Sequence, residues 1–525
     1  MTSAGRGLGA LAAPALAGLA VVSVLLVAVS DGNPLAGLAP LLSLGFLYLL
    51  WRLPLRVTLT VLVFLIFAID SPFEVPHAGM WEDPLMPLAR LLYDNLHKVT
   101  GISVLRFSGL DLLLLFLVFI ALYRKLTGSR IDPPTVATPR VLKQALFVSF
   151  AAVVFLEVMG ILRGGNAQQS LWQMRQIIFI PVVGALYQLG LQGPRDLKPL
   201  GMAILAAALF KVFLGAYFLY FVAHKQELSP PYVTNHTDSE LFVAAIMVVV
   251  TLWMEDPRAK HFLMMLLVVP VVLFGIVIND RRLAYVSLAA CLITVFLMMP
   301  MRRSKRFLLR TCVLALPLMI PYVAIGWSAQ GRVFKPVQVI KSVVDSDAGA
   351  NSQADSSTEF RNMENYNLYR TWLPNPLLGS GFGHEYNEVI LLPDISRFFP
   401  AYRYVPHNSI LWLWGIGGYV GFSAMWMFLV IGVFMMARAY PAARTVEERT
   451  GALVCLCIVV SFLNQAFGDM GTQSFQSVFF LAPAVVMGGK LAVASGVWPA
   501  PQEAPRRFGL ALLSRPRPSS PKVVA

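Results

Sequence analysis

Arginine side chains occur at the ends of apolar segments, where a membrane protein seldom places charge. The stretch VINDRRLAY, residues 277–285, is a short turn between two apolar runs. The arginines in such places are Arg163, Arg175, Arg281 and Arg282, and Arg361 lies in the long polar segment that follows residue 327. A guanidinium group stays charged and can bind two phosphate oxygens in a planar fork. Together on one membrane surface, these groups would suit a diphosphate on a lipid, although a single arginine can equally do no more than contact lipid headgroups.

His407 is the histidine best placed for acid–base chemistry. It begins the apolar run HNSILWLWG, beside Asn408, and an imidazole there can accept a proton near neutral pH. His236, in TNHTDSELF beside Asp238, is a weaker candidate. Either histidine could instead simply cap an apolar segment. Because no His, Cys, Asp or Glu residues follow the spacing of a metal site, we predict neither a metal nor another cofactor.

The composition indicates an all-α integral membrane protein. Of 525 residues, 57% are hydrophobic and 13% are charged, whereas soluble domains carry about 25% charged residues. Runs of roughly 20 apolar residues predict transmembrane helices, and about 12–14 can be placed. Their centres lie near residues 18, 43, 63, 115, 151, 180, 210, 246, 270, 291, 317, 420, 460 and 484. We interpret the first, residues 8–30, as a retained helix, because it lacks the cleavage site of a signal peptide.

The distribution of positive charge predicts the orientation. Most of the 42 Lys and Arg residues fall in gaps that share one side of the membrane with the N-terminus. Since short cytoplasmic loops are rich in these residues, we expect both termini to be cytoplasmic. The net charge of +14 then reflects topology and contact with anionic lipid, and it does not indicate a nucleic-acid partner.

Polar stretches divide the chain into regions. We expect N-terminal membrane helices at 1–70, an outer loop at 71–107, membrane helices at 108–327, a large outer loop at 328–406, C-terminal membrane helices at 407–498 and a disordered basic tail at 499–525. Residues 84–99 have the period of an amphipathic surface helix. Within the large loop we expect residues 345–358 to be flexible and the aromatic stretch after them to be helical and folded.

Two charged residues lie well inside predicted membrane helices. They are Glu157 and Lys211. A charge in the membrane interior is costly and is usually paired, so we predict that Lys211 is paired with a carboxylate or with lipid phosphate. Glu157 is the simplest partner, and a proton relay is the functional alternative.

Three motifs, in this order, resemble the O-antigen ligase and polymerase family of the bacterial cell envelope. The first is an arginine, a small residue and an aromatic residue at the start of an apolar run, Arg282 to Tyr285. The second runs from Arg361 to the turn NPLLGSGFG, residues 375–383, and the third is HNSILWLWGIGG, residues 407–418. The resemblance covers roughly residues 265–425.

This resemblance implies a metal-independent, inverting glycosyltransferase in the inner membrane, with its active site facing the periplasm. The donor would be a glycan on undecaprenyl diphosphate. The acceptor would be a sugar hydroxyl, on lipid A-core for a ligase or on a growing glycan for a polymerase. His407, Arg282 and Arg361 would be catalytic. Arg281, Arg163, Arg175 and Tyr285 would bind the diphosphate. Asn408, Gly381, Gly383, Asp238 and His236 would support the site, with the glycines letting backbone approach the sugar.

Two other classes of protein remain open. A transporter of lipid-linked glycans would also need arginines, but around a cavity at mid-membrane depth. A structural subunit of an envelope assembly would not need His407 at a helix boundary with arginines around it.

Overall fold

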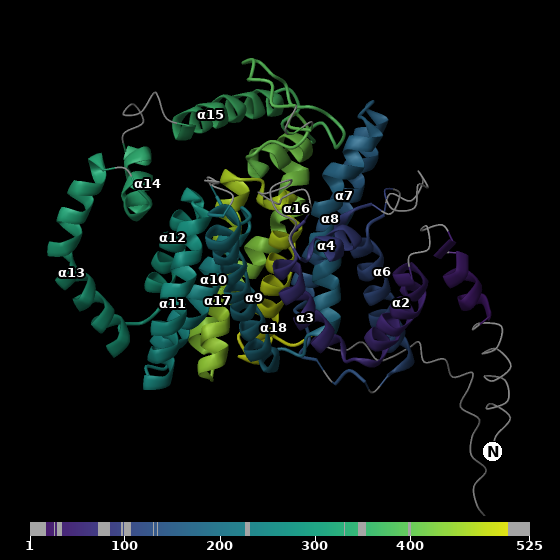
Figure 1. Cartoon of the computed structure of the whole chain (residues 1–525), viewed down its shortest axis with the longest axis horizontal. Coiled ribbons are helices and arrows are strands. Elements are labelled where there is room, and N and C mark those ends of the chain that lie inside the picture. Colours follow the sequence, from purple (N-terminus) through teal and green to yellow (C-terminus); the bar gives the residue numbers. More distant parts are fainter. Residues whose placement is uncertain are drawn as a thin grey trace, which may run out of the picture.

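A computed structural model describes most of the chain. The described residues are 17–25, 27–28, 34–71, 84–95, 98, 107–129, 131–133, 135–225, 232–329, 331–344, 353–396, 399 and 401–501. Within them the regular elements are all helices, apart from an isolated β-bridge between Asn95 and Ser108 (Figure 1). The predicted all-α membrane fold is confirmed. Parts of the predicted first helix and nearly all of the tail from Pro499 lie outside the described residues.

A helix covers every predicted centre from residue 43 onward. These helices are α2 (Pro34–Arg52), α3 (Leu55–Ala68), α6 (Gly109–Thr127), α7 (Arg140–Leu162), α8 (Ala167–Gly190), α9 (Leu197–Tyr217), α10 (Asp238–Glu255), α11 (Ala259–Asn279), α12 (Arg282–Met298), α13 (Arg303–Ser328), α16 (Ser409–Ala442), α17 (Val446–Gly468) and α18 (Phe475–Ala494). In the described part of the chain, seven helical segments are long and apolar enough to cross a membrane. The total of about 12–14 spans stays a prediction.

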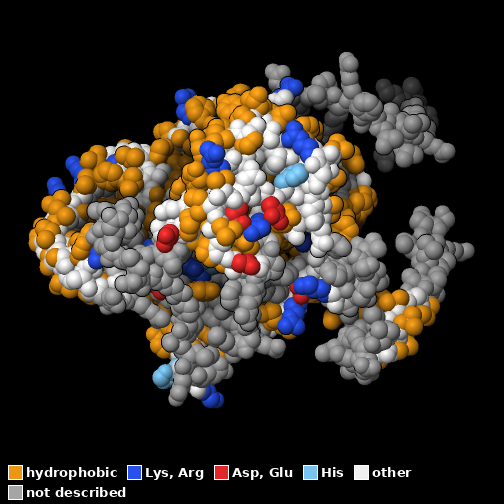
Figure 2. Space-filling model, turned by 90° about the horizontal axis from the view of Figure 1, so that it is seen from above, with side chains coloured by type: hydrophobic (Ala, Val, Ile, Leu, Met, Phe, Trp, Pro, Cys, Tyr) orange, Lys and Arg blue, Asp and Glu red, His pale blue; other side chains and the backbone are white. Residues whose placement is uncertain are grey.

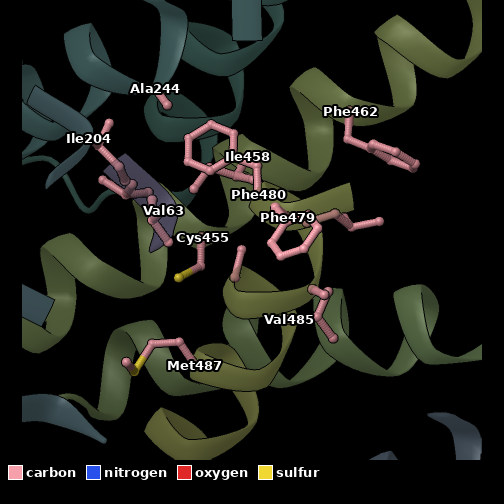
Figure 3. Packing of buried hydrophobic residues seen from close by; sticks show 14 of the residues in the cluster. Val63, Ile204, Ala244, Cys455, Ile458, Phe462, Phe479, Phe480, Val485 and Met487 are labelled. Atoms are coloured by element: carbon pink, nitrogen blue, oxygen red, sulfur yellow. The ribbon is translucent and has the colours of Figure 1, made fainter. Parts of the chain in front are cut away.

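The helices differ sharply in how much protein surrounds them. In their most apolar windows, 89% of α18 and 67% of α17 is buried, against none of α13. Figure 3 shows buried side chains of this core around α17 and α18, among them Phe462, Phe479 and Val485. Lipid is as apolar as these side chains, so close packing must hold the bundle together. Glycines provide it: a Cβ on Gly488 would lie 2.3 Å from Met436 Cγ on α16.

Two further helices lie between α13 and α16. They are α14 (Lys335–Val344) and α15 (Gln353–Trp372), and α15 crosses one end of the bundle (Figure 1). The expectation that residues 345–358 are flexible is wrong for its second half, because α15 already begins at Gln353. The segment from Gln353 to Thr358 contains no Gly or Pro, so the aromatic helix can extend back through it. Residues 345–352 lie outside the described part.

The predicted amphipathic helix is shorter than residues 84–99. Helix α4 runs from Met86 to Tyr93 and is followed by the extended residue Asp94. Asn95 then bridges to Ser108, which begins α6. This pairing ends the helix early and attaches the segment to the bundle.

Helix α16 is interrupted at Gly418, whose backbone has φ 56° and ψ −166°. The turn at residues 376–381 fits into the break. There Tyr419 N donates to Pro376 O at 2.8 Å, and Gly381 N donates to Ile416 O at 2.9 Å. Irregular backbone at membrane depth needs such partners, because lipid offers no hydrogen bonds. The turn therefore fixes the short first half of α16 to the rest of the protein.

Cysteine labelling tests the predicted orientation. In a Cys312→Ala background, which removes the exposed native thiol, we expect Asn362→Cys on α15 to react with an impermeant reagent from the periplasm. Arg303→Cys, exposed in the basic gap before α13, should react only after the membrane is permeabilised. Reaction of both from the same side would contradict the orientation.

Candidate functional site

Several helix ends meet below α15 at one end of the bundle. The end-on view in Figure 2 shows basic, acidic and histidine side chains together on this face. The parts of the chain that meet below α15 are the loop before α10, the turn between α11 and α12, the start of α16 and the segment after α17. Parts of the chain far apart in sequence thus supply one polar surface.

Asp469, just after α17, contacts the loop before α10 and helix α15. His236 Nδ1 contacts its Oδ2, and Arg361 Nη2 lies 3.6 Å from its Oδ1. Burial alone would raise the pKa of the Asp469 carboxyl, but His236, Arg361 and Arg281 outweigh burial and hold that pKa below its ordinary value. Asp469 is therefore an anion that holds positively charged groups together.

Arg281 has hydrogen-bond donors to spare. Its guanidinium carbon lies 3.9 Å from the centre of the Tyr232 ring, a cation–π contact. Its Nε and Nη2 atoms are buried and have no hydrogen-bond partner among the described residues. Burial lowers the pKa of Arg281 while Asp469 opposes this, and an arginine remains charged in either case. Buried donors of this kind suit an oxyanion from a ligand.

His407 forms a pair with Glu364, one helical turn after Arg361 on α15. The His407 backbone N donates to Glu364 Oε2 at 3.0 Å, and Nδ1 lies 3.2 Å from both carboxylate oxygens. The Glu364 side chain is 1% exposed. His407 O accepts from Met470 N at 2.8 Å, which ties the pair to the segment of Asp469. Because a carboxylate only accepts, the His407 Nδ1 must carry a proton, leaving Nε2 to act as a base.

Other predicted residues lie beside this site. Arg282 is the first residue of α12, next to Arg281, and Tyr285 follows about one turn later. Asn408 caps α16 by accepting from Leu411 N at 3.1 Å, and it donates to Asn365 on α15 at 3.0 Å. This last contact joins the start of α16 to α15.

Arg163 and Arg175 are not brought into the cluster around Asp469. Arg163 Nη1 donates to Gly379 O at 2.5 Å. Arg175 contacts the Asp111 carboxylate and donates to Ser108 Oγ at 2.5 Å, at the start of α6. Both guanidinium groups thus already hold parts of the fold together, and the structure gives no support to a diphosphate role for them.

Two of the three glycines of the NPLLGSGFG turn, Gly381 and Gly383, pack against neighbouring segments. A Cβ on Gly381 would lie 2.5 Å from the Cα and N atoms of Gly160 on α7. One on Gly383 would lie 3.0 Å from Asn166, before α8. We expected these glycines to let the backbone approach the sugar. In the structure they let it approach Gly160 on α7 and Asn166 before α8. The glycines support the site by fixing the turn.

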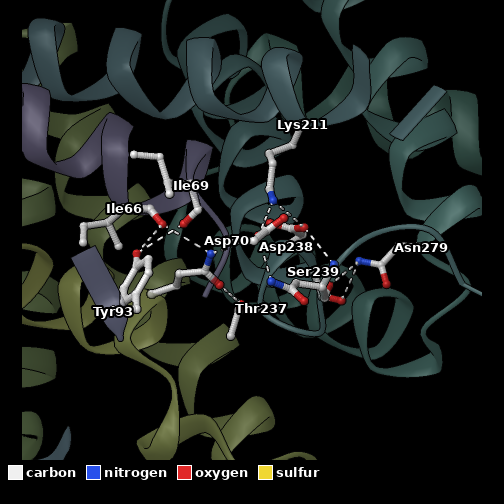
Figure 4. A network of polar contacts seen from close by, with 11 residues as sticks. Ile66, Ile69, Asp70, Tyr93, Lys211, Thr237, Asp238, Ser239 and Asn279 are labelled. Atoms are coloured by element: carbon white, nitrogen blue, oxygen red, sulfur yellow. Dashed lines mark hydrogen bonds and ion pairs between the residues drawn. The ribbon is translucent and has the colours of Figure 1, made fainter. Parts of the chain in front are cut away.

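The predicted Glu157–Lys211 pair is wrong. Figure 4 shows Lys211 between Asp70, after α3, and Asp238, whose Oδ2 lies 3.4 Å from Nζ. Glu157 instead accepts a 2.7 Å hydrogen bond from Ser170. Asn235 donates its backbone N–H to Asp238 at 2.9 Å. The predicted supporting residue Asp238 therefore anchors the loop that carries His236.

The sequence analysis missed Asp469, Glu364 and Tyr232. Asp469 could have been found, since it is the only acidic residue in NQAFGDMGTQSFQS, between the last two predicted spans. Glu364 and Tyr232 stand in stretches with many other polar residues, and nothing local marks them. Across the described residues, no group of three or more His, Cys, Asp or Glu side chains could hold a metal ion; the prediction of a metal-independent site stays a prediction.

Comparison with known families supplies an independent result. Residues 271–427 match the family model described as O-antigen ligase. No curated protein matches the chain. The match begins in α11, spans the turn with Arg281 and Arg282, includes Arg361 and His407, and ends in α16. It confirms the resemblance inferred from the three motifs. Residues 271–427 are thus similar to the O-antigen ligase family, which supports a membrane enzyme of the ligase or polymerase type.

Proposed function

We propose that this protein is an O-antigen ligase. It transfers a glycan from undecaprenyl diphosphate to a sugar hydroxyl of lipid A-core at the periplasmic face of the inner membrane. The observation that carries the proposal is the single cluster that joins Arg281 and Arg361, through Asp469, to the segment bonded to His407. An anion site and a base next to each other are what glycosyl transfer from a diphosphate requires.

The arginines act on the donor. Arg281 offers buried, unpartnered donors, and Arg361 has a side chain that is 39% exposed beside Asp469. Arg282 follows Arg281 in the same turn. As the bond between the sugar C1 and the phosphate oxygen breaks, its electron pair stays on the diphosphate. Fixed guanidinium groups stabilise this growing charge, so the proposed reaction needs no metal.

His407 acts on the acceptor. Its Nε2 takes the proton of the acceptor hydroxyl while the hydroxyl oxygen bonds to C1 opposite the departing diphosphate, which inverts the anomeric centre. Glu364 orients the ring and stabilises the imidazolium that forms. Phe360, whose ring centre lies 5.8 Å from that of His407, packs beside it.

A reconstituted assay tests these roles. We expect His407→Ala to lower turnover by about a hundredfold or more, the range of general-base catalysis. Glu364→Gln should lower turnover on the order of tenfold or more with an unchanged KM for the donor, because the ring loses its orientation. Transfer from lipid-linked glycan to lipid A-core in proteoliposomes containing EDTA is the measurement.

Glu385→Gln is the matched control. Glu385 is an exposed acid in the segment between α15 and α16, and its Oε2 lies 3.8 Å from Arg403 Nη1. This variant should leave turnover unchanged. Full activity of His407→Ala would contradict the proposed base. Activity that EDTA removes and magnesium restores would contradict the metal-independent reaction.

The glycans of a deletion strain distinguish ligase from polymerase. A ligase defect leaves long glycan on undecaprenyl diphosphate, whereas a polymerase defect leaves single repeats on core. A transporter would move lipid-linked glycan across proteoliposomes without joining it to any acceptor.

A further inference from the structure

The site contains a second histidine–carboxylate pair. His236 Nδ1 faces the Asp469 carboxylate, while the side chain is 40% exposed. Among the described residues, the structure records a hydrogen-bond partner only for Nδ1. Since the carboxylate accepts the Nδ1 proton, Nε2 is the atom that can meet a ligand. His236 and His407 are thus two imidazoles with the same kind of orienting partner in one site.

We propose that His236 is a catalytic residue on the donor side, where its imidazolium donates a proton to the departing lipid diphosphate. This inference rests on the proposed function and adds a step to it. His407 and His236 then have opposite roles: His407 removes a proton from the acceptor and His236 supplies one to the leaving group.

The neighbours of each histidine assign the roles. His236 shares Asp469 with Arg361, and Arg281 acts on the same carboxylate. Its ring also lies edge-on to Tyr232, with centres 6.1 Å apart, and Arg281 stacks on that same tyrosine. The groups facing His236 are therefore those expected to bind the diphosphate. His407 instead faces Glu364 and Phe360.

The bound donor adds negative charge beside His236. Arg281 and Arg361 are two cations against the single anion Asp469. A lipid diphosphate that carries a sugar has one negative charge on each phosphoryl group, so its arrival makes this region more negative. An added anion beside an imidazole stabilises the protonated form.

The step balances in atoms and charge. The bond between sugar C1 and the phosphate oxygen breaks, and its electron pair goes to that oxygen. His236 Nε2 gives its proton to the same oxygen, which removes the extra charge the diphosphate would gain. The acceptor oxygen bonds to C1 and its proton goes to His407. No oxidant, reductant or co-reactant is needed.

A buried ion-pair network holds the loop that carries His236. Asn235 donates its side-chain amide to Asp70 at 2.7 Å and its backbone N–H to Asp238 at 2.9 Å. Both carboxylates contact the buried Lys211. A loop held by a buried ion-pair network can present His236 at a fixed place, as proton transfer requires.

Binding of donor and product by purified full-length protein tests the proposal. The two probes are glycosylated undecaprenyl diphosphate and free undecaprenyl diphosphate, which carries the additional charge. We expect His236→Gln to weaken binding of the free diphosphate by about tenfold or more, the size of a lost charge-assisted hydrogen bond. Donor affinity should fall by less than about threefold. Turnover should also fall, and a higher donor concentration should not restore it.

His224→Gln, which removes an exposed histidine after α9, is the matched control and should change neither affinity. His236→Lys is the second variant. It restores a cation beside Asp469, so it should recover most of the affinity for the free diphosphate but not turnover.

Equal losses of donor and product affinity in His236→Gln, or no loss of either in that variant, would overturn the proposal. This failure differs from failure of the proposed function: wild-type protein would still transfer glycan to the acceptor, and only the role of His236 would be lost.

Discussion

Replacing Arg361 with alanine is expected to lower kcat/KM for glycan transfer by about a hundredfold or more. Arg361 Nη2 lies 3.6 Å from Asp469 Oδ1, and its side chain remains 39% exposed. It can therefore contact a ligand while Asp469 holds it in place. The loss should be greatest in turnover, because the charge on the leaving group is largest in the transition state.

Arg361→Lys keeps the positive charge but removes the planar guanidinium group, so it tests which of the two is needed. A lysine ammonium is a point charge and cannot bind two oxygens in a plane, so we expect it to restore little activity. Arg370→Ala is the matched control on the same helix, since Arg370 is exposed near the end of α15. Steady-state kinetics in proteoliposomes, together with donor binding, measure the effect. If Arg361→Ala keeps wild-type turnover, Arg361 has no role in catalysis.

Replacing Gly381 with alanine is expected to prevent the protein from folding stably. The backbone at Gly381 has φ +84°, and an added Cβ would lie 2.5 Å from two backbone atoms of Gly160. Helix α7 cannot yield to a methyl group as a flexible side chain could. Since Gly381 N also donates to Ile416 O, moving the turn would open the break in α16. We expect loss of the monodisperse peak in detergent.

Gly164→Ala controls for backbone strain alone. Gly164 has nearly the same φ, +86°, with no atom within 4 Å of an added Cβ. That substitution should cost only about 1–2 kcal/mol, and the protein should remain monodisperse with a lower melting temperature. If both variants behave alike, the contact with α7 is not what makes Gly381 necessary.

Hydropathy was enough to predict the helices. Each predicted centre from residue 43 onward lies in a helix, because a backbone in lipid must satisfy its own hydrogen bonds and long apolar runs leave few other choices. The motifs also marked Arg361 and His407, which the structure connects through Asp469, Met470 and Glu364. Local sequence is informative where the physical constraint is itself local.

Contacts between helices could not be predicted in this way. Lys211 was assigned to Glu157 because both lie inside apolar runs, but the side chain meets Asp70 and Asp238 at the ends of α3 and α10. Hydropathy gives the depth of a residue and not the direction it faces. Asp469 could be singled out as an isolated acid, but its partner His236 could not be predicted, because the two residues are 233 positions apart.

The turn at residues 376–381, which fits into the break in α16, is held by its main chain and not by its side chains. Its bonds to Tyr419, Val420 and Ile416 are made by main-chain atoms, which every amino acid possesses. The side chains of Leu377 and Leu378, by contrast, are 66% and 42% exposed. These two leucines can therefore be replaced without loosening the first half of α16, which begins just after His407. Such replacements would change the surface that the turn presents while its main-chain bonds to α16 stay the same.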